Sequence, residues 1–162
     1  MRKLPFLAAL CLLFLPLAAM AQDELNTVTC TFNDGKSVSI SFKAPAKGEK
    51  LPNNSVYTPG GSPMALLTET PLRFGNAPLP TGGYNVYVIP AKAKWTLVIN
   101  KGVKDATYDS TKDVARVQMD SGTIPGATAS PFTVYLDHSG PKQCSVRIYN
   151  DKTGYFADLM EE

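Results

Sequence analysis

The stretch "TVTCTFNDGKSVSISF", residues 27–42, carries the pattern that decides the fold. Apolar and polar residues alternate on both sides of Asn33-Asp34-Gly35. Successive side chains of a β-strand point to opposite faces, so a period of two indicates a strand with one buried face. Asp-Gly between two such runs is typical of a tight hairpin turn. The stretch therefore predicts two antiparallel strands joined by a short turn.

Similar evidence continues along the chain. Short runs rich in β-branched and aromatic residues are separated by clusters of Gly, Pro, Asn and Asp. We expect further strands at residues 64–68, 72–74, 84–89, 95–100, 114–119, 132–137, 144–149 and 155–159. No window shows sustained apolar spacing of three and four, so we expect almost no helix. The sequence predicts an all-β fold, an antiparallel β-sandwich or flattened barrel of about eight to ten short strands.

Residues 1–21 have the pattern of a secretory signal peptide. Arg2 and Lys3 precede a short apolar run, and Ala19-Met20-Ala21 supplies a small-x-small site before a polar segment. Pro16 interrupts the run, which is shorter than the roughly 20 apolar residues that span a bilayer. We expect cleavage after Ala21, no membrane anchor after cleavage, and a periplasmic or secreted protein with a single domain at residues 22–162.

The charge of the expected mature chain excludes one class of partner. Without Arg2 and Lys3, the 16 basic side chains fall to 14, which equals the number of acidic ones. The lysines are also scattered rather than clustered. No basic field is left to attract nucleic acid, so we expect no nucleic-acid partner.

Two cysteines, Cys30 and Cys144, remain in the expected mature chain. Each shares the apolar face of its predicted strand, with Val28 and Phe32 in one case and with Val146 and Ile148 in the other. An even number of cysteines in an oxidising compartment favours a disulfide, although two separate buried thiols are the alternative. The chain has no Cys-x-x-Cys motif, so a bridge would be structural.

The stretch "YTPGGSPMALL", residues 57–67, could hold a phosphate, a nucleophile or a bend. A phosphate loop needs a following helix and usually a lysine, whereas here Pro59 and Pro63 each remove an N–H. Ser62 lacks the Gly-x-Ser-x-Gly frame, and the only histidine, His138, lies in a turn-like segment. We expect a glycine bend and no catalytic residue.

Metal chemistry is poorly supported. The single histidine and the two cysteines expected in a disulfide leave too few ligands for zinc. Asp109 and Asp113, with Asp105 nearby, could bind calcium, but the spacing of a calcium loop is missing and a solvated acidic loop fits better. We expect no metal site and no cofactor.

The segments "LPTGGYNVYVIPAKAKWTLVINK", residues 79–101, and "YDSTKDVARVQM", residues 108–119, resemble an exported bacterial family, domain of unknown function 2911. The matching positions are Pro80, Gly83, Tyr84, Ile89, Pro90, Trp95, Thr96, Asn100, Lys101, Tyr108, Asp109 and Arg116. Relatives often carry Trp-Arg-x-Gly-x-Asn-Glu near residue 57, where this chain has Tyr57 and Gly60. The resemblance implies an exported all-β domain without an established activity.

Three residues are candidate binding residues: Arg116, Tyr84 and Tyr57. In "DVARVQM", residues 113–119, Arg116 shares the outer face of its strand with Val114, where its guanidinium suits a carboxylate of a neighbouring strand or of a ligand. Trp95 shares a face with Leu97 and Ile99 and is expected in the core.

Two classes of function are open. One is an exported non-enzymatic module that binds a small molecule, a carbohydrate or a protein, or has a structural role in the cell envelope. The other is a hydrolase-like or other enzyme whose site is assembled from residues distant in sequence. Convergent carboxylates or a base beside a serine in a pocket would favour the enzyme.

Overall fold

A computed structural model of the protein describes residues 24–101, 107–123 and 130–162. The predicted signal peptide, residues 1–21, lies outside the described residues and stays a prediction. Within the described ranges, no helix is both long enough and apolar enough to cross a membrane.

The described chain is almost entirely β-structure, as the sequence predicts. Its elements are β1 Leu25–Thr31, β2 Ser37–Lys43, η1 Pro59–Gly61, β3 Met64–Thr68, β4 Leu72–Phe74, β5 Ala77–Leu79, β6 Gly82–Ile89, β7 Thr96–Lys101, η2 Ser110–Lys112, β8 Asp113–Gln118, β9 Asp120–Thr123, β10 Ser130–Gly140, β11 Gln143–Asp151 and β12 Thr153–Glu161. The two 3₁₀ turns, η1 and η2, are the only helical elements in these ranges. The hairpin predicted at residues 27–42 is confirmed, with Cys30 opposite Val38 and Gly35 in the turn at a φ of +89°.

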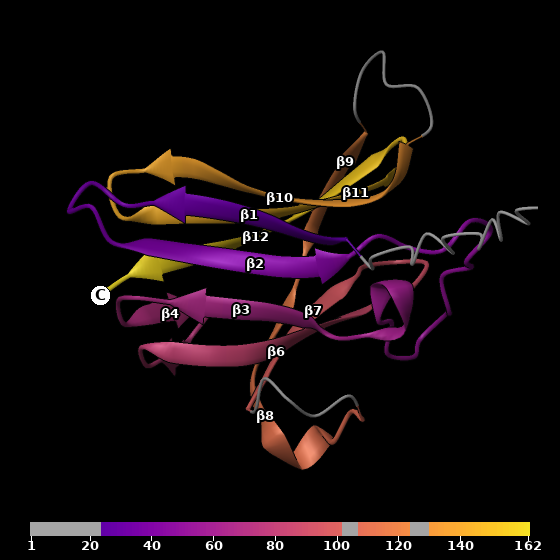
Figure 1. Ribbon diagram of the computed structural model, residues 1–162, viewed down its shortest axis with the longest axis horizontal. Helices are drawn as coiled ribbons and strands as arrows, with labels where there is room; N and C mark the ends of the chain where they lie inside the picture. Colours follow the sequence, from indigo (N-terminus) through magenta and orange to yellow (C-terminus); the bar gives the residue numbers. More distant parts are fainter. Residues whose placement is uncertain (1–23, 102–106, 124–129) are drawn as a thin grey trace, which may run out of the picture.

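The strands form two antiparallel sheets, so the sandwich is the observed architecture. One sheet, called sheet A, has the strand order β1-β2-β3-β6-β7-β8. The other, sheet B, has the order β10-β11-β12-β4-β5, and β9 also pairs with β12. In Figure 1, β1, β2, β3 and β6 lie side by side in front, and the ribbon of β8 runs directly on into β9, which belongs to the other sheet.

The described residues contain twelve strands, two more than the upper end of the predicted eight to ten. β5 lies in a segment predicted to be a turn, because Pro78 in its middle suggested a break. A proline is tolerated there because β5 is an edge strand. β9 was missed because its sequence, "DSGT", has no apolar pattern, and it is held by backbone pairing to β12. His138 was also expected in a turn, but it lies in β10 opposite Cys144.

The inner faces of the two sheets form one continuous core. Its fully buried side chains include Ile40 and Leu66 from sheet A and Phe74, Ile148 and Leu159 from sheet B. These residues alternate with exposed or half-buried ones along their strands, as expected when one face of each sheet packs on the other. Tyr87 and Val98 are also buried but are not part of this core cluster. The outer face of sheet A is therefore covered locally near β7.

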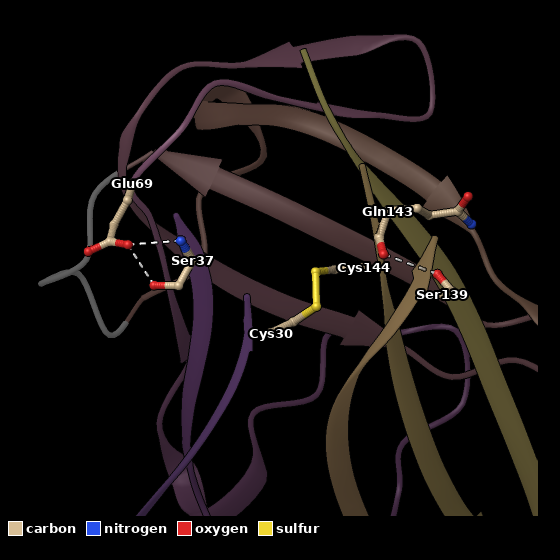
Figure 2. The surroundings of a disulfide bond; sticks show 6 residues. All are labelled: Cys30, Ser37, Glu69, Ser139, Gln143 and Cys144. Atoms are coloured by element: carbon tan, nitrogen blue, oxygen red, sulfur yellow. Dashed lines mark hydrogen bonds between the residues drawn. A yellow bond between two sulfur atoms is a disulfide. The ribbon is translucent and has the colours of Figure 1, made fainter. Parts of the chain in front are cut away.

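A disulfide between Cys30 of β1 and Cys144 of β11 joins the two sheets at one side, as the sequence predicts (Figure 2). The two Cα atoms are 6.2 Å apart, and the cysteines are separated by 114 positions in the sequence. On the same side, the Asn33 N–H donates to the Pro141 carbonyl over 3.4 Å. The opposite side of the sandwich is bounded by the edge strands β8 and β5.

The stretch at residues 57–63 is a bend, as predicted. Gly60 has a φ of +61°, and a Cβ placed on it would lie 2.7 Å from the Lys43 Cβ and 2.8 Å from the Ala44 carbonyl oxygen. The Gly60 N–H donates to a Glu49 carboxylate oxygen over 3.3 Å. The N–H groups of Gly61 and Ser62 donate to carbonyls of the same turn. The chain's own acceptors therefore use the amides that a phosphate would need.

Candidate functional site

A β-bulge in β8 shapes the surface around Arg116. Ile99 pairs with Ala115, and the next residue, Asn100, pairs with Asp113, so Val114 is an extra residue in β8. In a regular strand, residues three apart point to opposite faces. The bulge shifts the alternation by one position and brings Asp113 onto the face of Arg116.

The Asp113 carboxylate binds three side chains. Its Oδ1 accepts from Asn100 Nδ2 over 2.8 Å. Its Oδ2 accepts from the Tyr108 hydroxyl over 2.8 Å and from Arg116 Nε over 2.6 Å. The Asp113 side chain is only 12% exposed. A carboxylate removed from water in this way requires such partners, and hydrogen bonds to charged groups are the stronger kind.

The segment before β8 is fixed by the same network. Asn100, which is 2% exposed, also donates from Nδ2 to the Asp109 carbonyl over 2.8 Å. The Asp109 carboxylate caps η2 by accepting from the Thr111 N–H over 3.0 Å. The Tyr108 ring meets the Tyr87 ring edge-on, with 5.0 Å between centroids. Tyr108 thus contributes to covering the outer face of sheet A beside β8.

Arg116 is held on one side and open on the other. Its Nε binds Asp113, and its Nη2 donates to the Tyr108 hydroxyl. These bonds raise the pKa of the Arg116 guanidinium, chiefly through the hydrogen bond to Asp113. Burial and the bond to Asp113 raise the pKa of Tyr108, which stays a neutral phenol. The Arg116 side chain is 48% exposed.

Two shallow grooves meet at Arg116. The first, called the edge groove, has a volume of about 540 Å³ and runs between residues 74–77 and residues 114–118. The second, called the face groove, has a volume of about 680 Å³. Both are lined by Arg116 and Gln118. Arg116 is therefore the cation that the two grooves have in common.

The grooves are lined by donors rather than by acids. The polar side chains of the face groove are Asn54, Lys94, Thr96, Arg116 and Gln118. None of the described residues that line either groove is acidic. Lys94 is 52% exposed, and its nearest acid is the solvated Asp120 at 3.9 Å, a separation at which water weakens the attraction. The arrangement suits a ligand that accepts hydrogen bonds and carries negative charge.

Tyr57, the second sequence-predicted binding residue, lies in the interior, 5% exposed. Its ring meets Phe132 edge-on at 5.2 Å. Burial raises the pKa of Tyr57, and a hydrogen bond to Glu49 adds to this. The same carboxylate accepts from the N–H groups of Ala46 and Gly60. Tyr57 and Glu49 thus anchor the loop before η1, and the Tyr57 ring offers almost no surface to a ligand.

Tyr84, the third sequence-predicted binding residue, is 7% exposed. Its hydroxyl donates to the Pro80 carbonyl over 2.6 Å, four residues upstream. This contact resembles the tyrosine corner of other β-sandwiches, which fixes the start of a strand. Trp95 is buried, as predicted, and stacks on Tyr155 with 3.8 Å between ring centroids.

Of the candidate residues, Arg116 is the one that is both exposed and on a groove, whereas Tyr57 borders a smaller pocket of about 310 Å³ but is itself buried. Its position on the outer face agrees with the sequence, but its carboxylate partner lies on its own strand and not on a neighbouring one. The interpretation of residues 105–113 as a solvated acidic loop was wrong for Asp113, which the network largely buries. Among the described residues there is no cluster of three or more potential metal ligands. Asp105 lies outside the described residues.

Sequence reasoning missed that Asp113, Tyr108 and Asn100 form one hydrogen-bond network with Arg116. Asn100 and Tyr108 were noted only as positions of the family resemblance, and the structure brings both of them, together with Arg116, to Asp113. Lys94 and Gln118 gave no signal, because isolated polar residues on a strand face are common.

The fold and the grooves define an all-β sandwich domain with a hydrogen-bond-donating surface along one edge. The family described as "Protein of unknown function (DUF2911)" matches residues 24–156. The chain belongs to this family. Comparison with curated proteins and with solved structures found no match.

Proposed function

We propose that the protein is an exported, non-enzymatic binding module that holds an anionic group of its ligand at Arg116. The observation that carries the proposal is the geometry of the guanidinium. Asp113 and Tyr108 engage Nε and Nη2 and so restrict the side chain, which is nevertheless 48% exposed where the two grooves meet. The Nη1 and Nη2 end of an arginine presents two parallel N–H groups, which match a carboxylate or a phosphate.

The network favours binding over catalysis. The carboxylate closest to Arg116, that of Asp113, already accepts three hydrogen bonds. A general base needs a free lone pair directed at the substrate, and three of the roughly four lone-pair sites of the Asp113 carboxylate are occupied by its own partners. The polar side chains of the face groove are amides, a hydroxyl, an ammonium and a guanidinium group, which recognise anions and polar groups.

Two features support export to the periplasm or beyond. Residues 1–21 have the composition of a signal peptide. The Cys30–Cys144 disulfide is of a kind that persists in oxidising compartments and is rare in the cytosol.

Titration with small probes tests the binding proposal. Glutarate and inorganic phosphate are added to the protein residues 22–162 and followed by calorimetry, with the neutral diamide glutaramide as a matched probe. We expect binding near 1 mM for the anions, about −4 kcal/mol, and none for the diamide. Arg116→Gln should weaken binding at least about tenfold, which corresponds to about 1.4 kcal/mol.

The control variant is Arg147→Gln on sheet B. Arg147 is also ion-paired, with 2.9 Å between its Nε and Asp137 Oδ2, but it lines neither groove. Its substitution should leave anion binding unchanged. Equal loss in the two variants, or no loss in Arg116→Gln, would show that the site is elsewhere.

A further inference from the structure

β8 is an edge strand of sheet A, with β7 on one side and no paired strand on the other among the described residues. The direction of its peptide groups follows from its register. The Met119 N–H donates to the Trp95 carbonyl over 2.8 Å, and Thr96 pairs with Gln118. Residues of an antiparallel pair alternate between hydrogen-bonded and non-hydrogen-bonded positions. The peptide groups of Ala115 and Val117 therefore point toward β7.

The peptide groups of Arg116 and Gln118 consequently point away from β7. They repeat every second residue, about 6.6–6.8 Å apart along the strand. Both residues line the edge groove. An exposed strand edge of this kind is a template for pairing with another extended chain.

The far wall of the edge groove is the turn between β4 and β5. A Cβ on Gly75 would lie 3.0 Å from Val117 Cγ2, so this turn packs against the inward-facing side of β8. The turn covers the apolar side of the edge and leaves a groove of about 540 Å³ along residues 114–118. The opening therefore gives access to the outward peptide groups together with the Arg116 side chain.

We propose that the ligand held at Arg116 is an extended segment of another polypeptide, which adds as an antiparallel strand to β8 and places an Asp or Glu side chain opposite Arg116. This inference rests on the proposed function, since the acidic side chain supplies the anionic group. In a hydrogen-bonded antiparallel pair, the two opposed residues exchange N–H···O bonds and their side chains lie on the same face. One acidic residue can then pair its backbone with Arg116 and its carboxylate with the guanidinium.

The positive charge of Arg116 favours an acidic segment over a second copy of this chain as the added strand. Antiparallel pairing of two β8 strands would bring two Arg116 side chains onto one face, and like charges on neighbouring strands oppose pairing. An acidic side chain on the added strand would instead be attracted to Arg116. The paired backbone groups favour a polypeptide over an acidic polysaccharide, which lacks amides at this repeat.

The test uses the blocked pentapeptide Ser-Val-Glu-Val-Ser and four relatives. One relative has Gln in place of Glu, one is N-methylated at Glu, one is N-methylated at both Val residues, and one is the Glu peptide in scrambled order. The N–H of the Glu residue is expected to point at β8, and those of the Val residues away from it. N-methylation at Glu, or Glu replaced by Gln, should weaken binding at least about tenfold, whereas N-methylation at Val should change it less than about threefold.

Two variants of the protein test whether the peptide binds along β8. Arg116→Gln should remove the preference for Glu over Gln. Gln118→Pro removes an outward N–H while keeping the pairing with β7, because proline is tolerated on an edge strand when its nitrogen faces outward. Compared with Gln118→Ala, which lacks the same side-chain amide but keeps the backbone N–H, Gln118→Pro should weaken the Glu peptide at least about tenfold and bind glutarate equally well. Intact amide signals of Ala115 and Val117 in NMR spectra would show that this variant is folded.

The outcomes separate this inference from the proposed function. Two results would overturn strand addition even if glutarate still bound at Arg116. One is equal binding of the two N-methylated peptides. The other is Arg116-dependent binding of polygalacturonate that is tighter than binding of the Glu peptide. Loss of the Arg116 dependence for both glutarate and the Glu peptide would overturn both proposals. Selective failure of the peptide N-methylated at Glu would support strand addition.

Discussion

Asp113 and Arg116 form an ion pair within one strand, with 2.6 Å between Oδ2 and Nε, although they are three positions apart. The bulge at Val114 makes this contact feasible, since it places both side chains on the outer face of sheet A. The two residues of the pair have different roles. Asp113 is largely buried and holds the network together, whereas Arg116 is half exposed and faces the grooves.

This division predicts different effects on stability. Asp113→Ala should lower the free energy of unfolding by about 2–4 kcal/mol, because three hydrogen bonds are lost and the buried Asn100 amide loses an acceptor. Arg116→Gln should lower it by less than about 1 kcal/mol, as for an exposed ion pair. Urea unfolding measures both, and Asp120→Ala is a solvated acidic control. A larger loss in Arg116→Gln than in Asp113→Ala would contradict this division.

The bend at η1 predicts unequal effects at two adjacent glycines. Gly60→Ala should destabilise by about 2–4 kcal/mol, because the new Cβ would meet Lys43 and Ala44 and the backbone has a positive φ. Gly61→Ala is the matched control, since its φ is +74° but nothing lies within 4 Å of a Cβ there. It should cost about 1 kcal/mol from backbone strain alone. Ser62→Ala should leave binding intact. A lower melting temperature for Gly61→Ala than for Gly60→Ala would refute the predicted clash.

The disulfide predicts a large dependence of stability on redox state. Cys30 and Cys144 close a loop across 114 positions, so reduction should lower the free energy of unfolding by about 4–5 kcal/mol in the chain-entropy model. Urea unfolding with and without dithiothreitol measures the difference, and a Cys30→Ala/Cys144→Ala variant should match the reduced protein. Protein recovered from the periplasm should resist alkylation in denaturant until it is reduced. Two freely alkylated thiols would disprove the bridge.

The hydrogen bonds of the Glu69 carboxylate predict that the folded state loses stability in acid. Its carboxylate accepts from the Ser37 N–H over 2.8 Å and from the Ser37 hydroxyl over 2.7 Å, as Figure 2 shows, and these bonds lower the pKa of Glu69 below its ordinary value of 4.5. A carboxyl whose pKa is lower in the folded state stabilises the fold above the unfolded pKa. That contribution is lost as the pH falls below 4.5 and through the folded value.

Glu69→Gln should flatten the fall in stability below this pH, because the titrating group is gone. Unfolding free energies measured between neutral pH and strong acid test this, with Glu162→Gln as the control. An unchanged acid slope in Glu69→Gln would assign the loss to other carboxylates, such as Asp34 and Asp109, whose pKa values are also lowered by hydrogen bonds.

Much of the fold could be predicted from the sequence because it depends on local alternation. The hairpin at residues 27–42 and the strands at Met64–Thr68 and Leu72–Phe74 follow from one buried face per strand. The disulfide was predicted from the even number of cysteines in an expected oxidising compartment, together with their positions on apolar faces. β5 and β9 could not be predicted from local alternation. Pro78 makes the sequence of β5 look like a turn. β9 forms only by pairing with β12, a strand that is distant in the sequence.

The site was harder to predict for a physical reason. A bulge is a mismatch between two strands, so no property of residues 113–116 alone reveals it. Without the bulge, the alternation places Asp113 and Arg116 on opposite faces. The grooves depend on β4 and β5 lying beside β8, which the local sequence does not specify.

NMR chemical-shift mapping with glutarate tests the central claim most directly. The Nε–H of Arg116 and the backbone amides of residues 114–118 report on both grooves. The account predicts saturable shifts concentrated at these signals, unchanged in Arg147→Gln and abolished in Arg116→Gln. Shifts centred on other residues, or shifts that persist in Arg116→Gln, would contradict it.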